Sequence, residues 1–521
     1  MATIFTNADQ TTNASNAPVY QLGSYDTLMV GPDAVLATTG LGSHGVNGTE
    51  EVVVMLSGDI FTALGNGINT GSGANIRVTT DGSIISGANG LYLQGSFHHV
   101  TNAGYIQAED YGVRMTGYGL VLNSGEITAG GGILSSNRLE LNNSGLIQSI
   151  GSDDGGWWNG ETVKVSTGGA SIVNTGTIAS VQGTAITIGS AAGQASDVLN
   201  SGVISATEGY SALVSGAGAE HVINTGTIDG NVYLSAGNDV FDATLGQTFG
   251  QVDGGNGDDT ILGGATADML FGRAGLDSIT GGGGDDTLGG DAGEDTLLGG
   301  DGDDLVIGGD GADLMEGGAG LDILSYTDAS VAVTVDLATG QAEGGAEGDS
   351  FSGFEAVRGG NFDDALTGTG GTETLSGGGG GDTLSGQGGI DRLYGEAGKD
   401  WLVGGAGADF LFGGAEADTF RYLSIGDSTV AATGRDRIRD FNQAEGDRLH
   451  LWSIDADTTV SGNQAFAFIG DAAFGNHARE LRFEAMGATT QVQADVNGDG
   501  KADFAIQIMS TVTLTAADFV L

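Results

Sequence analysis

A nine-residue unit, G-G-x-G-x-D-x-U-x with U a large apolar residue, restricts the fold of this chain more than any other feature. Eight units run without a slip from Gly254 to Ser325, and seven more run from Gly359 to Arg421. A degenerate unit, LSAGNDVFD, precedes them at 234–242. Repetition at a short fixed period is typical of solenoids, so we expect a stack of coils here.

The acidic and apolar positions of the unit are held without exception. An acid fills the sixth position in all fifteen units, as Glu373 in one and as Asp in the rest, and an aliphatic or aromatic side chain fills the eighth. A flexible glycine-rich linker whose acids serve only solubility is the alternative interpretation. Drift of composition would not keep both positions in register, so the pattern favours an ordered repeat.

The physics of the unit predicts a metal site. Three residues around U suffice for a short strand, and the glycines permit the turn G-G-x-G-x-D. Two units then make one coil of a parallel β-roll, and stacking places each carboxylate beside the carbonyls of a neighbouring turn. Flexible oxygen-only cages suit Ca²⁺ better than Mg²⁺. The predicted ligands are Asp259, Asp268, Asp277, Asp286, Asp295, Asp304, Asp313, Asp322, Asp364, Asp382, Asp391, Asp400, Asp409 and Asp418.

Composition supports a role for cations in folding. The chain has 67 acidic and 16 basic residues, a net charge of −51, yet 39% of it is hydrophobic. Such a polyanion repels itself until cations neutralise it. The charge excludes nucleic acid and disfavours anionic membranes as partners. No cysteine is present, which excludes disulfides and thiolate metal sites.

The units resemble the RTX nonapeptides of hemolysin-type calcium-binding proteins over about 252–421. The resemblance implies on the order of ten Ca²⁺ ions bound between turns. Two units depart from the pattern, because Phe362 replaces a glycine in one and Thr369 and Glu373 alter the next. Calcium is therefore in doubt at these two turns.

The last hundred residues resemble the C-terminal domain that follows the repeats in serralysin-type secreted proteases. The resemblance rests on DRIRDFNQAEGDRLHL (436–451) and TLTAADFVL (513–521). It implies a domain that caps the roll and a terminal signal for type I secretion, with an ordinary terminal strand as the alternative. The first residues lack a basic start and an apolar run, and no stretch approaches a membrane span. We therefore expect a secreted, extracellular protein that uses the type I machinery as a partner.

A second metal motif lies near the C-terminus. In DVNGDGKAD (495–503), Asp495, Asn497, Asp499 and Asp503 match positions 1, 3, 5 and 9 of an EF-hand-like loop. The twelfth position is Ile506, where a bidentate Glu belongs. The motif is either a calcium site completed from elsewhere or an Asp/Asn/Gly turn between strands.

The first 250 residues repeat more loosely, with the pattern U-x-N-x-G-x-I. The spacing predicts a parallel β-helix whose asparagines stack as a hydrogen-bonded ladder in one corner. A sandwich of antiparallel strands is the alternative. The repeated asparagines are Asn102, Asn123, Asn143, Asn174, Asn200 and Asn224.

Catalytic chemistry is sparse in this N-terminal region. No H-E-x-x-H motif is present, so the serralysin resemblance carries no protease activity. A cluster of His98, His99, Tyr105, Tyr111 and Arg114 lies within about one coil. We interpret it as surface residues, because uronate chemistry needs cationic groups and the first 250 residues contain only four Lys and Arg residues.

One insertion within the β-helix could contact a ligand. GSDDGGWWNGE (151–161) is expected to bulge from a coil with Trp157 and Trp158 at its tip. Paired tryptophans stack on sugars or dock a partner. They could equally cover the side of the solenoid.

These observations predict an all-β chain with a parallel β-helix, calcium-binding β-rolls and a capping domain. The N-terminal repeats resemble the β-helices of secreted adhesins, so we expect a non-enzymatic adhesin, matrix or surface-layer component, with a polysaccharide or cell-surface partner. A calcium-dependent polysaccharide lyase or epimerase is the alternative. The predicted regions are a cap (1–50), the β-helix (51–250), the first RTX block (251–325), an insert (326–358), the second RTX block (359–421) and the capping and secretion domain (422–521).

Overall fold

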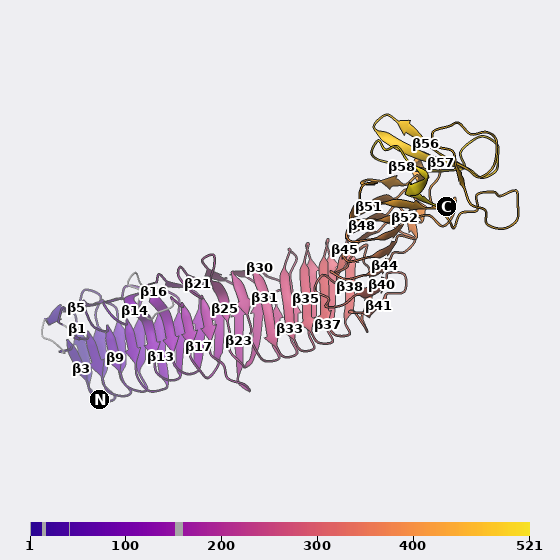
Figure 1. The fold of residues 1–521 in the computed structure, drawn as a ribbon. Coiled ribbons are helices and arrows are strands. Elements are labelled where there is room, and N and C mark those ends of the chain that lie inside the picture. The colour runs from indigo at the N-terminus through magenta and orange to yellow at the C-terminus, as the bar shows by residue number, and fades with distance from the viewer. Residues whose placement is uncertain (1, 13–16, 41, 152–159) are drawn as a thin grey trace. The chain divides into compact units, whose positions relative to one another are not determined.

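The computed structural model of the chain describes residues 2–12, 17–40, 42–151 and 160–521. Figure 1 shows parallel strands stacked in successive coils, and the described residues form two compact units, 1–286 and 287–521. The only helices of the described residues are two 3-10 turns, η1 (Ala432–Gly434) and η2 (Ala516–Asp518). Within the described ranges, no helix has the length and apolar character needed to cross a membrane.

The N-terminal unit is a parallel β-solenoid with three stacks of strands. The first stack contains β1 (Thr3–Thr6), β4 (Thr27–Val30), β7 (Val53–Leu56), β10 (Asn75–Val78), β13 (His98–Asn102), β15 (Gly119–Asn123), β17 (Leu139–Asn143), β20 (Ala170–Asn174), β23 (Ala195–Asn200), β26 (Ala219–Asn224), β29 (Val240–Asp242), β32 (Thr260–Leu262) and β34 (Ser278–Gly283). The parallel pairing confirms a solenoid over the antiparallel sandwich. The region predicted as a cap already contributes coils to this stack, because β1 pairs with β4.

The second and third stacks complete each coil. The second contains β2 (Gln10–Thr12), β5 (Val35–Thr38), β8 (Asp59–Thr62), β11 (Ser83–Ser86), the first halves of β14 (Tyr105–Met115) and β16 (Glu126–Ser135), β18 (Leu146–Ser149), β21 (Thr177–Ser180), β24 (Val203–Ala206), β27 (Thr227–Asp229) and β30 (Gln247–Phe249). The third contains β3 (Tyr20–Leu22), β6 (Val46–Gly48), β9 (Ile68–Thr70), β12 (Leu91–Leu93), the second halves of β14 and β16, β19 (Val163–Val165), β22 (Ile186–Ile188), β25 (Ser211–Val214), β28 (Asn231–Tyr233), β31 (Gln251–Asn256) and β33 (Met269–Ala274).

The coil changes from three strands to two where the nonapeptides begin. The second stack ends at β30, and the later coils of this unit use only β31 to β34. A nonapeptide has room for one short strand and one turn, so two of them make a two-strand coil. The geometry of the β-helix therefore passes into that of the β-roll inside one compact unit.

The C-terminal unit continues the two-strand coil within itself. One set of strands contains β36 (Thr296–Asp301), β38 (Leu314–Ala319), β40 (Val333–Asp336), β41 (Gln341–Gly344), β42 (Ser350–Ser352), β44 (Ala365–Thr367), β46 (Thr383–Ser385), β49 (Trp401–Val403), β52 (Thr419–Arg421), β54 (Arg448–His450) and β59 (Phe519–Val520). Residues eighteen apart pair directly, as Leu297 does with Met315. This register confirms that two nonapeptides form one coil.

A second set of strands in this unit ends in antiparallel hairpins. It contains β35 (Thr287–Ala292), β37 (Leu305–Asp310), β39 (Ile323–Ser325), β43 (Ala356–Arg358), β45 (Thr374–Gly379), β48 (Arg392–Ala397), β51 (Phe410–Ala415), β53 (Arg437–Ile438), β55 (Ala467–Phe468), β56 (Glu480–Met486), β57 (Thr489–Asp495) and β58 (Phe504–Ile508), with the short pair β47 (Gly388–Gly389) and β50 (Ala406–Gly407) beside it. Strands β56, β57 and β58 are antiparallel neighbours. The last strand, β59, pairs in parallel with β54.

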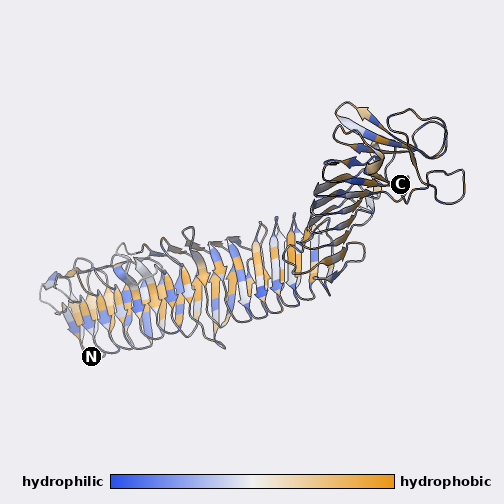
Figure 2. Cartoon of the chain, in the orientation of Figure 1, coloured by the Kyte–Doolittle hydropathy of each residue, from blue (hydrophilic) through white to orange (hydrophobic). Residues whose placement is uncertain are grey.

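The core is one inward-facing apolar position per nonapeptide strand. All fifteen eighth-position side chains, from Ile261 to Phe420, have 0% exposure. Figure 2 shows this apolar character along the strands of the coils. In the insert, Val333 and Val335 of β40 are buried, whereas Val331 is 52% exposed. Each buried aliphatic side chain contributes about 1.5–3 kcal/mol, so the roll is held by a thin core.

Candidate metal centre

Two rows of buried carboxylates follow the two turn edges of the nonapeptide coils, because successive units contribute their acids to alternate edges. The fifteen sixth-position side chains are at most 5% exposed. One carboxylate oxygen accepts a hydrogen bond from the backbone N–H of the corresponding residue one coil earlier, as when Asp391 N–H donates to Asp409 Oδ1 at 2.9 Å. We call this arrangement the carboxylate ladder. The same contact, at 2.8–3.1 Å, joins Asp259 to Asp277, Asp268 to Asp286, Asp295 to Asp313, Asp304 to Asp322, Asp364 to Asp382, Glu373 to Asp391, Asp382 to Asp400 and Asp400 to Asp418, and the pair differs by eighteen residues each time.

The second carboxylate oxygen is the feature of the ladder that indicates a metal ion. At several rungs in the described part of the chain, this oxygen is buried and has no hydrogen-bond partner. A carboxylate only accepts hydrogen bonds, and burying one without compensation is costly. The oxygens therefore need a cation. They belong to Asp259, Asp313, Asp322, Glu373, Asp382, Asp391, Asp400, Asp409 and Asp418.

The first glycine of each unit leaves space beside this oxygen. A Cβ atom on Gly299 would lie 2.4 Å from Asp304 Oδ2 and 2.4 Å from the carbonyl oxygen of Gly317. A Cβ on Gly395 would likewise lie 2.3 Å from Asp400 Oδ2. Any larger residue would fill the space between a carboxylate and a carbonyl of the next coil. The glycine thus preserves an oxygen-lined cradle.

The second position of most units turns the backbone into the left-handed region, with Gly264, Gly360 and Thr369 as exceptions. Glycine occupies it in most units, with φ of 121° at Gly300 and 105° at Gly309. Some other residues keep the same turn at a cost in strain, as Asp291 does with φ of 71° and Glu396 with φ of 73°, but Thr369 does not adopt it. The fold therefore imposes this turn even where the residue disfavours it.

Charge within the ladder opposes folding without a cation. Burial, reinforced by neighbouring carboxylates, raises the pKa of Asp259, Asp382 and Asp418 to about 7. Among the described residues, no three His, Cys, Asp or Glu side chains are grouped so that they could hold a metal by side chains alone. A bound ion must therefore take backbone carbonyl oxygens as well. That donor set fits Ca²⁺, and the cradle of Asp304 and Gly317 is an example of the residues that would hold it.

The units that depart from the sequence pattern also depart in their contacts. Asp364 Oδ2 accepts the Gly360 N–H at 2.7 Å, and Asp268 Oδ2 accepts the Gly264 N–H at 2.8 Å. The Thr369 hydroxyl donates to Glu373 Oε1. The second oxygens of Asp364 and Asp268 thus already have partners, whereas Glu373 keeps an unpartnered Oε2. The expected doubt about calcium therefore applies to the turn of Asp364 and extends to that of Asp268.

The ladder includes acids that the nonapeptide register missed. They share a shorter signal, an acid two residues before a buried apolar residue, as in Asp436-Arg437-Ile438. Asp349 accepts the Asp313 N–H and Asp447 accepts the Asp418 N–H, at 2.9 and 3.0 Å. The missed members are Glu220, Asp349, Glu355, Asp436 and Asp447, and Asp239, the sixth residue of the degenerate unit at 234–242, also joins the ladder.

The EF-hand-like residues form the loop between the antiparallel strands β57 and β58. Asp495 Oδ1 accepts the Gly498 N–H at 2.6 Å, and its Oδ2 accepts the Gly500 N–H at 2.8 Å. Asn497 Nδ2 donates to Asp503 Oδ1 at 2.9 Å, and Asp499 lies 3.4 Å from Lys501 Nζ. The polar side chains therefore brace their own loop, and calcium binding here stays a prediction.

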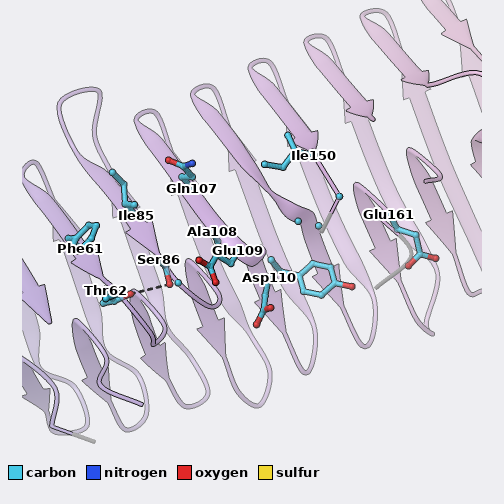
Figure 3. A pocket seen from close by; sticks show the side chains of 17 residues that line it. Phe61, Thr62, Ile85, Ser86, Gln107, Ala108, Glu109, Asp110, Ile150 and Glu161 are labelled. Atoms are coloured by element: carbon cyan, nitrogen blue, oxygen red, sulfur yellow. Dashed lines mark hydrogen bonds between the residues drawn. The ribbon is translucent and has the colours of Figure 1, made fainter. Parts of the chain in front are cut away.

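A cavity of about 650 Å³ lies on the side of the β-helix. Figure 3 shows Phe61, Ile85 and Gln107 on successive coils, with Glu109 and Glu161 at the same cavity. It forms beside a register shift in β14, opposite the glycines at 130–132 of β16. No described residue that lines it is a Lys, Arg or His.

The sequence cluster of possible catalytic residues is not brought together at this cavity. Of the five residues, only Tyr111 lines it, and burial raises the pKa of Tyr111 to about 12. His98 is 2% exposed, and burial lowers its pKa. Arg114 lies over the ring of Tyr92 at 5.2 Å. Trp157 and Trp158 lie outside the described residues.

A family model agrees with this geometry in the repeat blocks. The model of the RTX calcium-binding nonapeptide repeat matches in four copies, at 253–288, 289–324, 349–384 and 385–420. Two solved structures from Azotobacter vinelandii mannuronan C5-epimerase are similar. The AlgE6R3 subunit is 29% identical, with 31% of this chain and 78% of that chain covered and a TM-score of 0.18. The AlgE6R2 subunit is 28% identical, with 31% and 88% covered and a TM-score of 0.18.

A more distant likeness reaches beyond the blocks. The extracellular lipase LipA from Serratia marcescens is 14% identical, with 63% of this chain and 45% of that chain covered and a TM-score of 0.15. No curated protein matches the chain. The family match and the buried carboxylate ladder agree, and the glycine-rich blocks of this chain are RTX calcium-binding nonapeptide repeats.

Proposed function

We propose that the chain is a secreted protein whose RTX blocks fold on extracellular calcium and carry the β-helix as a non-enzymatic binding surface, in an adhesin, matrix or surface-layer component. One observation carries the calcium-folding part: buried carboxylate oxygens without hydrogen-bond partners recur along the described ladder. Each would repel its neighbours in a calcium-free coil. Binding and folding are then one event.

The position of the C-terminus supports export before folding. Phe519 and Val520 form β59, and Asp518 accepts hydrogen bonds from the backbone and hydroxyl of Thr515. A type I exporter that reads this segment would need it unpaired. Low intracellular calcium keeps the ladder repulsive, and roughly millimolar calcium outside matches weak extracellular sites. The secretion signal in 422–521 and the exporter as partner are parts of this proposal.

The calcium-folding step can be tested on the full-length chain by circular dichroism during a calcium titration. We expect a cooperative gain of strand signal, because each ion neutralises neighbouring rungs. A parallel titration with magnesium is the control and should not reproduce the gain. A chain that is equally structured in excess chelator contradicts the proposal.

Localisation needs its own experiment. In a bacterial host with a type I exporter, the full chain should accumulate in the medium. A variant with Asp518→Ala and Phe519→Ala should remain in the cell, whereas Glu208→Gln in an exposed loop should be exported normally. Equal export of all three proteins contradicts a signal at the C-terminus.

A polysaccharide lyase or epimerase is the second candidate, favoured by the 650 Å³ cavity on the β-helix. The lack of a cationic side chain among its described lining residues argues against uronate substrates, whose carboxylate needs neutralising. Incubation with alginate and pectate, followed by absorbance of unsaturated ends and by NMR of the uronate residues, tests it. We expect no change in the polymers, and turnover that depends on Glu109 or Glu161 would replace our choice.

A further inference from the structure

At the corner of the β-helix that leads into the carboxylate ladder, the side chain changes from a hydroxyl to a carboxylate over three coils. Ser196, Glu220 and Asp239 occupy successive rungs there. Ser196 Oγ accepts the Ala170 N–H at 3.2 Å, and Asp239 Oδ1 accepts the Glu220 N–H at 2.6 Å. Asp239 N–H then donates to Asp259 Oδ1 at 2.8 Å. The ladder therefore begins inside the β-helix, before the first matched repeat at 253.

Both acids of this corner have a buried oxygen that needs a partner. Glu220 is 1% exposed, and its Oε1 accepts the Ser190 hydroxyl at 2.6 Å. Asp239 is also 1% exposed. Within the described residues, Glu220 Oε2 and Asp239 Oδ2 have no partner in hydrogen-bond geometry. Burial raises the pKa of the Glu220 carboxylate, although the hydroxyls of Ser196 and Ser215 lie close enough to lower it in part. Two carboxylates on adjacent coils, each with one such oxygen, are costly unless a cation lies between them.

The surroundings of these acids supply further oxygen atoms and open space. The segment SGAGAEHV (215–222) keeps glycine at the second and fourth positions of a nonapeptide and places Glu220 at the sixth. A Cβ on Gly237 would lie 1.9 Å from the carbonyl oxygen of Gly218 and 2.9 Å from Asp239 Oδ1. Gly237 has a φ of 153°, which orients this tight turn. Hydroxyl, carbonyl and carboxylate oxygens are the donors that calcium prefers.

We propose that Glu220 and Asp239 bind a calcium ion in the last coils of the β-helix, outside the RTX blocks. The ion neutralises the two acids, so the stability of this edge of the β-helix depends on bound calcium. The calcium-dependent part then extends from Asp259 back to Glu220, and includes β25, β26 and β28. The proposal depends on calcium binding by the repeats, and it is independent of secretion and adhesion.

Hydrogen exchange of the full-length chain tests the site locally. In the wild-type chain, peptides from 211–224 should exchange roughly tenfold or more slowly in saturating calcium than in chelator. In Glu220→Gln and Asp239→Asn, this calcium effect should fall below about twofold, because a neutral amide binds the ion poorly. Peptides from 305–324 in the same samples should keep their calcium response. Glu208→Gln, an exposed change in the preceding coil, is the matched control and should behave as wild type.

The sign of the effect without calcium separates a ligand from a merely structural residue. Both substitutions remove a buried charge and keep the side-chain shape. In chelator, the variants should therefore exchange more slowly at 211–224 than the wild type, whereas a structural residue would lose protection in both conditions. Loss in both conditions, or a variant that keeps the calcium effect at 211–224, overturns the proposal. No calcium response there in the wild type also overturns it, and the response at 305–324 tells whether the RTX sites fail with it.

Discussion

Two ladders of short polar side chains follow the solenoid, and the buried polar atoms of the two ladders find their partners in different ways. In the β-helix, each Asn Nδ2 donates to the next Asn Oδ1 at 2.8 Å, from Asn102 to Asn224. In the regular units of the RTX blocks, a rung such as Asp409 accepts one backbone N–H and has a second oxygen that faces a cradle. An amide both donates and accepts, so the asparagine ladder satisfies itself. A carboxylate ladder cannot, because it contains no donor.

The difference predicts that the two parts of the chain fold under different conditions. The asparagine ladder is neutral and also donates to backbone carbonyls, such as that of Val203 from Asn174 at 3.0 Å. It needs only the chain itself. The carboxylate ladder accumulates negative charge in a buried row and needs a second component. We therefore expect the asparagine-ladder part to fold without an ion and the RTX blocks to fold only with calcium.

Removal of calcium should separate the two ladders by the largest effect. In chelator, amides of 287–421 should lose most of their hydrogen-exchange protection, because the rungs there repel one another. Amides of the asparagine-ladder strands β13 to β23 should stay protected in the same sample. Hydrogen exchange with mass spectrometry gives both readings at once. Equal loss, or equal retention, in both parts would remove the distinction between the ladders.

Placing a carboxylate in the asparagine ladder should give the next largest effect. Asn174→Asp removes the donor to Asn200 Oδ1 and adds a buried charge without a calcium cradle. We expect a loss of about 3–5 kcal/mol in the free energy of unfolding. Urea denaturation followed at the β-helix measures it. Asn174→Ala should cost only about 1–3 kcal/mol, and rescue of Asn174→Asp by calcium would show that the cradle is not specific to the RTX blocks.

The converse exchange, an amide in the carboxylate ladder, should act through calcium alone. Asp400→Asn keeps the hydrogen bond from the Asp382 N–H but weakens the ion site. The calcium midpoint of folding should rise about tenfold, which corresponds to roughly 1.4 kcal/mol. The matched control is Asp363→Asn at an exposed fifth position, whose carboxylate accepts the Gly381 N–H and should be replaceable. An unchanged midpoint in Asp400→Asn would mean that this rung holds no ion.

The sequence predicts the regular ladder because its spacing is local. Nine residues make one strand and one turn, so the acids of the two blocks are found by counting. Asp349 and Glu355 escape that count because the insert, with its β40–β41 hairpin, breaks the period while the coil geometry restores the rung. Only the acid two residues before a buried apolar side chain remains as a signal there.

Other parts of the candidate sites depend on contacts that spacing does not encode. The cavity at Glu109 follows from a register shift in β14, and the facing glycines allow the ring of Tyr111 to approach within 2.4 Å of where a Gly131 Cβ would lie. The loop at Asp495 has the residue types of a calcium site, but the same oxygens serve its own backbone amides. Composition alone cannot distinguish an ion from an N–H as the partner of a carboxylate.

The pH dependence of the calcium-free chain should give the smallest effect, since only some rungs, such as Asp259 and Asp382, have a pKa raised to near neutrality. Burial raises the pKa of Asp259 and Asp382 to about 7, whereas an unfolded Asp titrates near 4. Between these values the folded state binds more protons, so its stability without calcium should increase as the pH falls from about 8 to 5. Protons then partly replace the ion, and the calcium midpoint should rise in the same range. Thermal unfolding in chelator across this pH range measures the first effect, and the β-helix transition should barely move because its ladder of amides does not titrate. A chelated chain that loses order on acidification would show that charge repulsion does not hold the RTX blocks open.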